Sequence, residues 1–481
     1  MTFIGVRIMS TFAELQQIAN DDVKVIIGSE KQSPDVTIET NAELDVARDH
    51  LDEIEDRNAA TIDILTDTVV ATESRDLTDR ELKVLRTTLK ALTGEKPIRH
   101  VALEDGEEKP LNRTLALEGF KETLKKFWAY IKEQAKKFWN LLKRWWFKTF
   151  DISKRARFRA EKIMKNADNE YGVSADNDIN FKEIKKLAIN GRINDSAATL
   201  KGLKDLESIV FEFINSTTSE RFNDTAQALT DKATFILNGI KSHADSLMKA
   251  RGEDGRVERA DLSIRSSDLN DFNTIVEQVY AGADSDLVSH RDFGLDKADR
   301  YLKQYGEPDK TTYRHSEYLP GDKWILCVKP TLKSSEHTVD ITSTIDSLRT
   351  SRLVVAPCLY AGKQYDPDSL VKVLATTSIS RGCESIIRIC EYINEYRISF
   401  DRRDRFKERV IKDIDQAVND VSQENESAYA ECDRVIRSFA NAIVGLIRRR
   451  SDFETSLCAY SMTTSVAFLN YSELSLKQYT K

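Results

Sequence analysis

Apolar side chains recur at alternating spacings of four and three along residues 119–150, and this periodicity constrains the fold more than any other feature. In a helix of about 3.6 residues per turn, positions with this spacing fall on one face and form a seam two positions wide. The sequence therefore predicts an amphipathic helix over residues 119–150. The seam consists of Leu124, Trp128, Ile131, Ala135, Phe138, Leu142 and Trp145.

The same segment concentrates tryptophan and lysine. Four of the 5 tryptophans lie in it, Trp128, Trp139, Trp145 and Trp146, and its nine basic and two acidic residues give a net charge of 9 − 2 = +7. Three interpretations stay open: a core helix with solvent-facing lysines, an interfacial membrane helix, or a nucleic-acid contact through phosphates. The charged face is predicted to include Lys125, Lys132, Lys136 and Lys143.

Helical spacing also dominates the rest of the chain. It recurs in residues 203–214, 222–247, 383–396, 406–421 and 429–446. The last of these segments runs into Arg448-Arg449-Arg450, and basic residues suit the C-terminus of a helix. The content of only 8 prolines and 18 glycines in 481 residues favours helices over a turn-rich β architecture.

Three short segments have a different pattern, rich in β-branched and aromatic residues. Residues 324–328, 338–342 and 353–356 are separated by polar loops, which predicts strands of a small antiparallel sheet. The fold class expected is therefore mainly α, a multi-helix bundle-like body with a small antiparallel β insertion.

Charge divides the chain at residue 118. Residues 1–118, here called the acidic leader, hold 14 basic and 25 acidic residues, a net of −11. Since the whole chain has 72 basic and 79 acidic residues, the remainder has 58 and 54, a net of +4. Removal of the leader would thus reverse the sign of the charge.

We predict five segments: a propeptide-like leader (1–118), a basic aromatic amphipathic helix (119–160), a helical domain (161–318), a β-containing insertion (319–380) and a C-terminal helical bundle (381–481).

Motifs of catalysis and cofactor binding are absent from the sequence. Neither phosphate-cradling glycine motif occurs, the 6 histidines are isolated, and the 6 cysteines form no C-x-x-C pair. We therefore expect no enzyme, cofactor or metal, and reduced core cysteines. A hydrolase stays open as an alternative, because the residues of a catalytic triad can lie far apart in the sequence and meet only in the folded protein. No signal peptide and no membrane span are expected either.

An Ala-x-Glu motif occurs three times, always in the first quarter of the chain. Two copies, Ala71-Thr72-Glu73 and Ala102-Leu103-Glu104, lie within the leader, and the third, Ala116-Leu117-Glu118, directly precedes Gly119. The break at Gly106 to Pro110 adjoins the last two copies. A protease needs an exposed segment, which favours this region. We predict cleavage after Glu118, with Glu73 and Glu104 as secondary candidates.

This arrangement resembles the internal head proteins of giant tailed bacteriophages related to phiKZ. The prohead proteases of large tailed phages typically cut after glutamate in a small-x-Glu motif, and Ala116-Leu117-Glu118 followed by Gly119 is similar to such a site. The resemblance covers mainly residues 100–150. It implies a non-enzymatic virion structural protein that enters the capsid interior from the host cytoplasm during assembly.

The resemblance also implies partners. They would be other components of the capsid interior, the prohead protease and packaged DNA, and proteins of this group are thought to be ejected with the genome. The alternative is a membrane-docking or membrane-active protein covered by its acidic leader. The oligomeric state is left open.

Overall fold

The computed structural model divides the chain into two compact units, Met1–Glu39 and Thr40–Lys481, and every described residue belongs to the second. The described residues are 133, 140, 142–143, 145–147, 149–169, 178–192, 196–215, 227–240, 269, 271–272, 288–289, 311–330, 341–358, 370–422 and 430–479.

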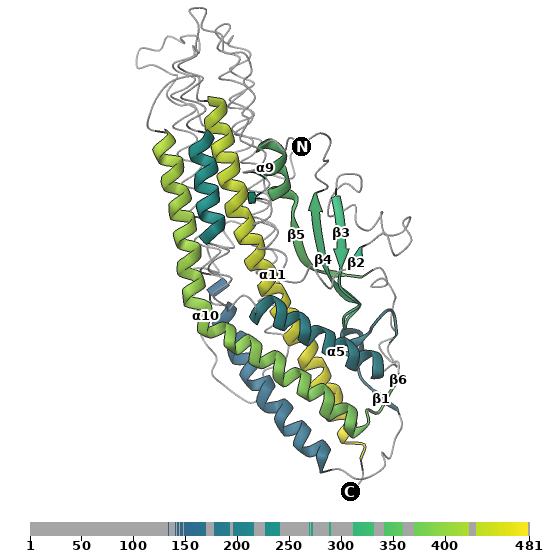
Figure 1. Cartoon of the computed structure of the whole chain (residues 1–481). Coiled ribbons are helices and arrows are strands. Elements are labelled where there is room, and N and C mark those ends of the chain that lie inside the picture. The colour runs from purple at the N-terminus through teal and green to yellow at the C-terminus, as the bar shows by residue number, and fades with distance from the viewer. Residues whose placement is uncertain are drawn as a thin grey trace, which may run out of the picture. The chain divides into compact units, whose positions relative to one another are not determined.

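Two long antiparallel helices form the frame of the second unit (Figure 1). They are α10 (Thr376–Ser422) and α11 (Ala430–Leu476), each of 47 residues, or about 70 Å at 1.5 Å per residue. Their pairing is antiparallel because contacts advance along α10 as they recede along α11: Gly382 lies against Phe468, and Tyr396 hydrogen-bonds Glu454.

Two shorter helices complete a four-helix arrangement in the lower half of the view in Figure 1. The first, here called the amphipathic helix, comprises the described helical residues between 140 and 168. It runs antiparallel to α10, since Trp146 stacks on Tyr396 while Asp168 accepts a hydrogen bond from Ser380. The second, α5 (Ser196–Val210), continues into the π-helical turn η2 (Phe211–Asn215).

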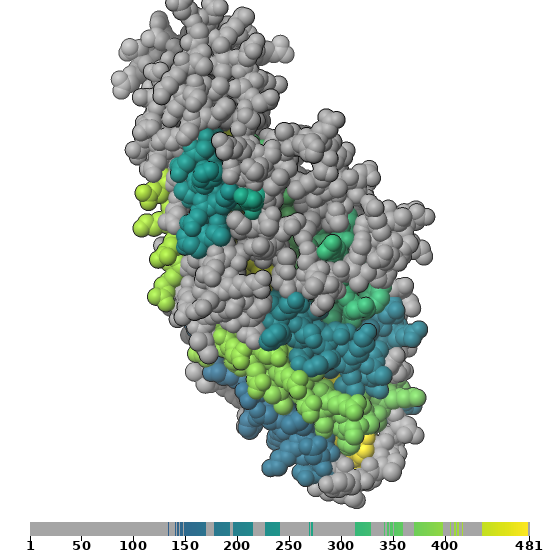
Figure 2. Space-filling model, in the orientation of Figure 1, coloured from purple at the N-terminus to yellow at the C-terminus, as the bar shows by residue number. Residues whose placement is uncertain are grey.

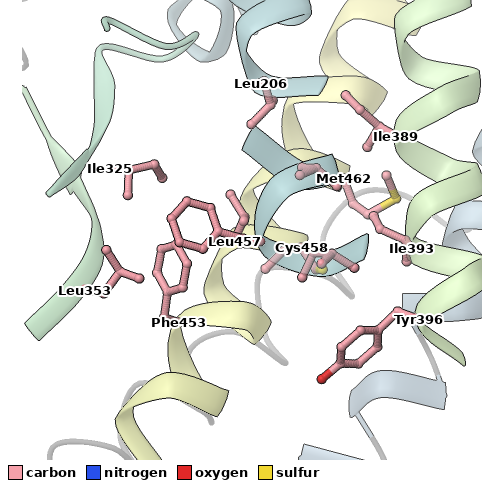
Figure 3. Close-up of a cluster of buried hydrophobic side chains, with 14 of the residues drawn as sticks. Leu206, Ile325, Leu353, Ile389, Ile393, Tyr396, Phe453, Leu457, Cys458 and Met462 are labelled. Atoms are coloured by element: carbon pink, nitrogen blue, oxygen red, sulfur yellow. The ribbon is translucent and has the colours of Figure 1, made fainter. Parts of the chain in front are cut away.

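The middle and C-terminal half of α11 lie at the centre of the core. Figure 3 shows Phe453, Leu457 and Met462 between side chains of α5, α10 and the sheet. Apolar positions on α11 at spacings of three, four and five bury several sides of the helix, and a helix that is apolar on more than one side belongs in an interior. Partners in this cluster are Leu206, Ile325, Leu353, Ile389 and Ile393.

A four-stranded antiparallel sheet packs beside α11, in the order β2-β3-β4-β5. Its strands are β2 (Val288–Ser289), β3 (Thr311–His315), β4 (Lys323–Pro330) and β5 (Arg352–Pro357), and α9 (Ile341–Thr350) connects the last two. Both of its faces are buried. Alternate residues of β4 join either the main core, as Ile325 does, or a separate cluster, as Trp324 does.

A pair of short strands lies at the far end of the bundle from α9 (Figure 1). Strands β1 (Asp178–Asn180) and β6 (Leu370–Lys372) pair antiparallel, with Ile179 opposite Val371. A short 3-10 helix, η1 (Ile184–Leu187), follows β1.

A further helical stretch covers residues 227–240 and buries Leu229, Ala233, Ile236 and Ile240.

The predicted fold class, mainly α with a small antiparallel sheet, is confirmed. Residues 324–328 and 353–356 lie in β4 and β5, and residues 203–214 lie in α5 and η2. The segments 383–396 and 406–421 belong to one helix, α10. The sheet also takes in β2 and β3, which precede residue 319. The division into five segments stays a prediction.

The strand predicted over residues 338–342 is wrong at Ile341 and Thr342, which begin helix α9. The β-branched residues there suggested a strand. However, Ile341, Ile345 and Leu348 follow at spacings of four and three and are all buried. Packing of this helical face outweighs the intrinsic strand preference, which is worth only about 1 kcal/mol.

Candidate functional site

The inner face of the amphipathic helix packs into the core of the bundle. Trp145 and Trp146 retain only 3% and 2% of their exposure, and Phe150 is equally buried. The Trp146 ring stacks on Tyr396 of α10 with centroids 4.4 Å apart, and meets Phe150 at 5.4 Å. Stacked and edge-on aromatic pairs contribute about 1 kcal/mol beyond their buried area.

For Trp145 and Trp146, the two described tryptophans of this segment, the packing favours a core helix over an interfacial membrane helix or a nucleic-acid contact. The rings of Trp145 and Trp146 are core residues, so they are not placed to enter a headgroup layer or to contact nucleic acid. Lys143 beside them is half-buried. The other members of the predicted site, Trp128, Trp139, Lys125, Lys132 and Lys136, lie outside the described residues.

The outer face of the same helix carries phenylalanine and lysine in the open. Phe147 is 52% and Phe158 is 70% exposed, the latter the highest value among the large apolar residues that the structure describes. Figure 2 shows part of this helix, in blue, on the surface beside the yellow-green α10. The exposed basic side chains on the helix are Lys154, Arg155, Lys162 and Lys165.

Two arginines at the flanks of this face fix the helix to its neighbours. Arg157 bridges Glu161 at 2.9 Å and Glu391 of α10 at 3.0 Å, and the hydrogen bond that it donates to Glu161 raises the pKa of its guanidinium. Arg159 donates two hydrogen bonds to Glu473 of α11, at 2.7 and 2.8 Å. The basic residues of the helix thus divide into an anchoring set and an exposed set.

The exposed set was only partly found by reasoning from the sequence. The apolar seam was traced only to residue 150 and the basic aromatic segment only to residue 160, whereas the described helix continues to residue 168. Lys162 and Lys165 lie beyond both predictions, and Phe158 was not singled out as part of an exposed face. The signal that reveals them is a spacing of seven, four and seven along Phe147, Lys154, Phe158 and Lys165.

The arginines at 448–450 were predicted to end a helix, and that prediction is wrong. Helix α11 continues to Leu476, and Arg448, Arg449 and Arg450 are buried in its middle. The reason is that Phe453 and Leu457 continue the apolar spacing beyond the arginines and enter the core.

These buried arginines connect elements that are far apart in the sequence. Arg449 donates to the Leu348 carbonyl of α9 at 2.6 Å, which links the sheet region to α11. Arg450 pairs with Glu454 at 3.3 Å and lies over the Phe213 ring at 5.2 Å. Glu454 in turn accepts a hydrogen bond of 2.7 Å from Tyr396. The cluster is a structural junction of α9, η2, α10 and α11.

Burial suppresses the reactivity of two cysteines on α10. Cys383 and Cys390 are buried, unpaired thiols on α10, and burial raises the pKa of each to about 12. A thiol with so high a pKa is a poor nucleophile at neutral pH.

Within the described parts of the chain, no cluster of three metal-ligating side chains occurs. Nor does any described helix have the length and apolarity needed to cross a membrane.

The predicted cleavage sites lie outside the described residues. This holds for the junction Ala116-Leu117-Glu118-Gly119 and for the secondary candidates Glu73 and Glu104. Cleavage after any of them therefore stays a prediction.

Comparison with known proteins gives one informative result. The model of a family described as phiKZ-like phage internal head proteins matches residues 39–474. Neither the curated proteins nor the solved structures gave a match. The family match covers the helices and strands described above, except for the last two residues of α11, and also most of the acidic leader.

Proposed function

The chain belongs to the phiKZ-like phage internal head proteins, structural proteins of the capsid interior, and from this premise we propose that it is made as a precursor. In this proposal the prohead protease cleaves after Glu118 during assembly, while the precursor is being taken from the host cytoplasm into the prohead. The mature body, residues 119–481, then associates with packaged DNA and is ejected with it.

The observation that carries the proposal is the coincidence of a motif and a charge boundary. Ala116-Leu117-Glu118 stands where a region of −11 meets a region of +4. Cleavage there would change the protein from a net −7 to a net +4 in one step. A polyanion such as DNA attracts the second form and repels the first.

The acidic leader has a defined role in this proposal. It keeps the precursor from binding DNA before the capsid is complete, because its carboxylates compete with phosphates for the same lysines and arginines. Tethering makes such competition effective, since a linked segment acts at about millimolar effective concentration. The family match begins at residue 39, so most of the leader is part of what the family shares.

The exposed basic residues of the amphipathic helix support contact with DNA. Lys154, Arg155, Lys162 and Lys165 are exposed on one helix, and all of them follow the proposed junction. Each contact with a phosphate releases counterions, so the binding should weaken steeply as salt is added.

The N-terminus of the protein in phage particles tests the cleavage directly. Mass spectrometry of the virion protein should find a chain that begins at Gly119. A Glu118→Gln variant should accumulate uncleaved, and a matched Glu122→Gln variant, four residues past the junction, should be cleaved normally. Virions that contain only the chain from Met1 would refute the proposal. A chain that begins at Asp105 or Ser74 would move the junction to a secondary candidate.

Retardation of duplex DNA in a gel tests the second half of the proposal. The form recovered from particles should bind DNA with a strong dependence on salt, and the full chain should bind at least about tenfold more weakly at the same salt. Equal binding by both forms would remove the role of the leader.

A further inference from the structure

Two phenylalanines and two lysines of the amphipathic helix form one straight line on its outer surface. The residues are Phe147, Lys154, Phe158 and Lys165, and together they are here called the outer stripe. At about 100° per residue, spacings of seven, four and seven keep them within about 40° of one another around the helix axis. The stripe extends for about 27 Å along the helix.

The stripe is apolar and basic at the same time. Its phenylalanines are 52% and 70% exposed, while Lys154 and Lys165 are exposed beside them. Arg155 and Lys162 add positive charge along one border. The other border carries Glu161, which is paired with Arg157, and Asp168, which accepts a hydrogen bond from Ser380. Asp151 is the acid on the first border.

The rigid support of the stripe sets it apart from a scattered pair of surface aromatics. The opposite face of the helix is held by Trp146 stacked on Tyr396, and its flank is fixed by Arg159 on Glu473. The phenylalanine rings are therefore held outward on a packed element, so no helix has to form when a partner binds.

Three partners can be compared by their chemistry. Duplex DNA would bind the lysines, but its bases are stacked inside and offer nothing to a phenylalanine ring. A second, antiparallel copy of the stripe would set each lysine opposite a phenylalanine, but it would also bring together two faces of the same net positive charge. An anionic lipid surface satisfies both residue types, because the rings enter the headgroup boundary while the lysines meet lipid phosphates.

We propose that the outer stripe docks the protein on the surface of an anionic lipid bilayer. The helix would lie in the plane of the surface, with Phe147 and Phe158 inserted and the basic residues at headgroup level. This inference does not depend on cleavage after Glu118, which is tested separately by the N-terminus.

Vesicle flotation tests the proposal. The full chain and the form recovered from particles are each floated with phosphatidylcholine vesicles that either contain or lack phosphatidylglycerol. At least one form should float only with the anionic vesicles. A Phe147→Ser/Phe158→Ser variant should lower the bound fraction by roughly tenfold, since it removes most of the insertable apolar area. Lys154→Ser/Lys165→Ser should lower it as well.

The matched control is Phe235→Ser. Phe235 is 55% exposed with Lys232 over its ring, but it lies on the helical stretch 227–240. Its variant should float like the unaltered protein, and thermal unfolding should show that all the variants remain folded.

Three results would overturn the proposal. They are no flotation of either form, flotation unchanged in the double phenylalanine variant, and an equal loss with Phe235→Ser. Loss of duplex DNA retardation in the phenylalanine variant, with vesicle binding intact, would assign the stripe to nucleic acid instead.

Discussion

The basic residues of the amphipathic helix and those in the middle of α11 look alike in the sequence but have opposite surroundings. Lys154, Arg155 and Lys162 are exposed, whereas Arg448, Arg449 and Arg450 are almost completely buried. The difference arises from what flanks them. The first run occupies the outer side of a helix that is buried on one face, and the second interrupts a helix that the core surrounds. A basic run therefore indicates a binding surface only where one face of its helix is left uncovered.

The largest effect should come from the inner face of the amphipathic helix. Trp146→Ala would leave a cavity against Tyr396 and Phe150, and it should lower the free energy of unfolding by about 4 kcal/mol. Phe158→Ala on the outer face should change it by less than about 0.5 kcal/mol. Urea unfolding measures both. Similar losses for the two variants would contradict the division into inner and outer faces.

Substitution of arginine by alanine should lower the free energy of unfolding much more in the buried basic run than in the exposed one. Arg450→Ala would remove the arginine that pairs with the buried Glu454 and the contact with Phe213, at a cost of about 3 kcal/mol. Arg155→Ala, an identical change on the exposed run, should cost less than about 0.5 kcal/mol. The midpoints of chemical unfolding give the comparison, and a stable Arg450→Ala protein would show that the junction is dispensable.

Alanine substitutions at two glycines should change the stability of the protein in opposite directions. A Cβ at Gly382 would collide with the Phe468 ring where α10 crosses α11, so Gly382→Ala should cost about 2 kcal/mol. Gly239 is exposed with no atom within 4 Å of such a Cβ. Gly239→Ala should therefore stabilise the protein by about 0.5 kcal/mol through helix propensity. Calorimetric unfolding would detect the two signs, and equal signs would refute the close approach of the long helices.

A change of stability with pH should appear in alkali. Burial raises the pKa of Cys383 and Cys390 from 9.0 to about 12, so the unfolded chain loses these protons first. Stability from the neutral thiols is complete below pH 9 and is lost progressively up to about pH 12. From pH 9 to pH 10 the loss should be about 1 kcal/mol per thiol. Urea unfolding of the Cys383→Ala/Cys390→Ala variant should show a shallower dependence on pH, and an unchanged slope would argue against deep burial.

Much of this architecture could be predicted because the spacing of apolar residues along the chain was enough to identify individual helices and strands. The helical spacing at 203–214 and 383–396 and the β-branched runs at 324–328 and 353–356 were each enough to identify an element. The failures have one cause. At Ile341 and at Arg450, the local residue type favoured one structure, while packing with distant elements favoured another.

The sequence by itself determined the mainly α fold, the small antiparallel sheet, the opposite charges on either side of residue 118 and the resemblance to internal head proteins. These follow from spacing, composition and motifs, which are properties of neighbouring residues. Only the tertiary structure decided that Trp145 and Trp146 are core residues, that Phe147 and Phe158 are exposed, and that the arginines at 448–450 form a buried junction. Burial depends on which elements meet, and those elements lie up to 314 residues apart, as Arg159 and Glu473 do.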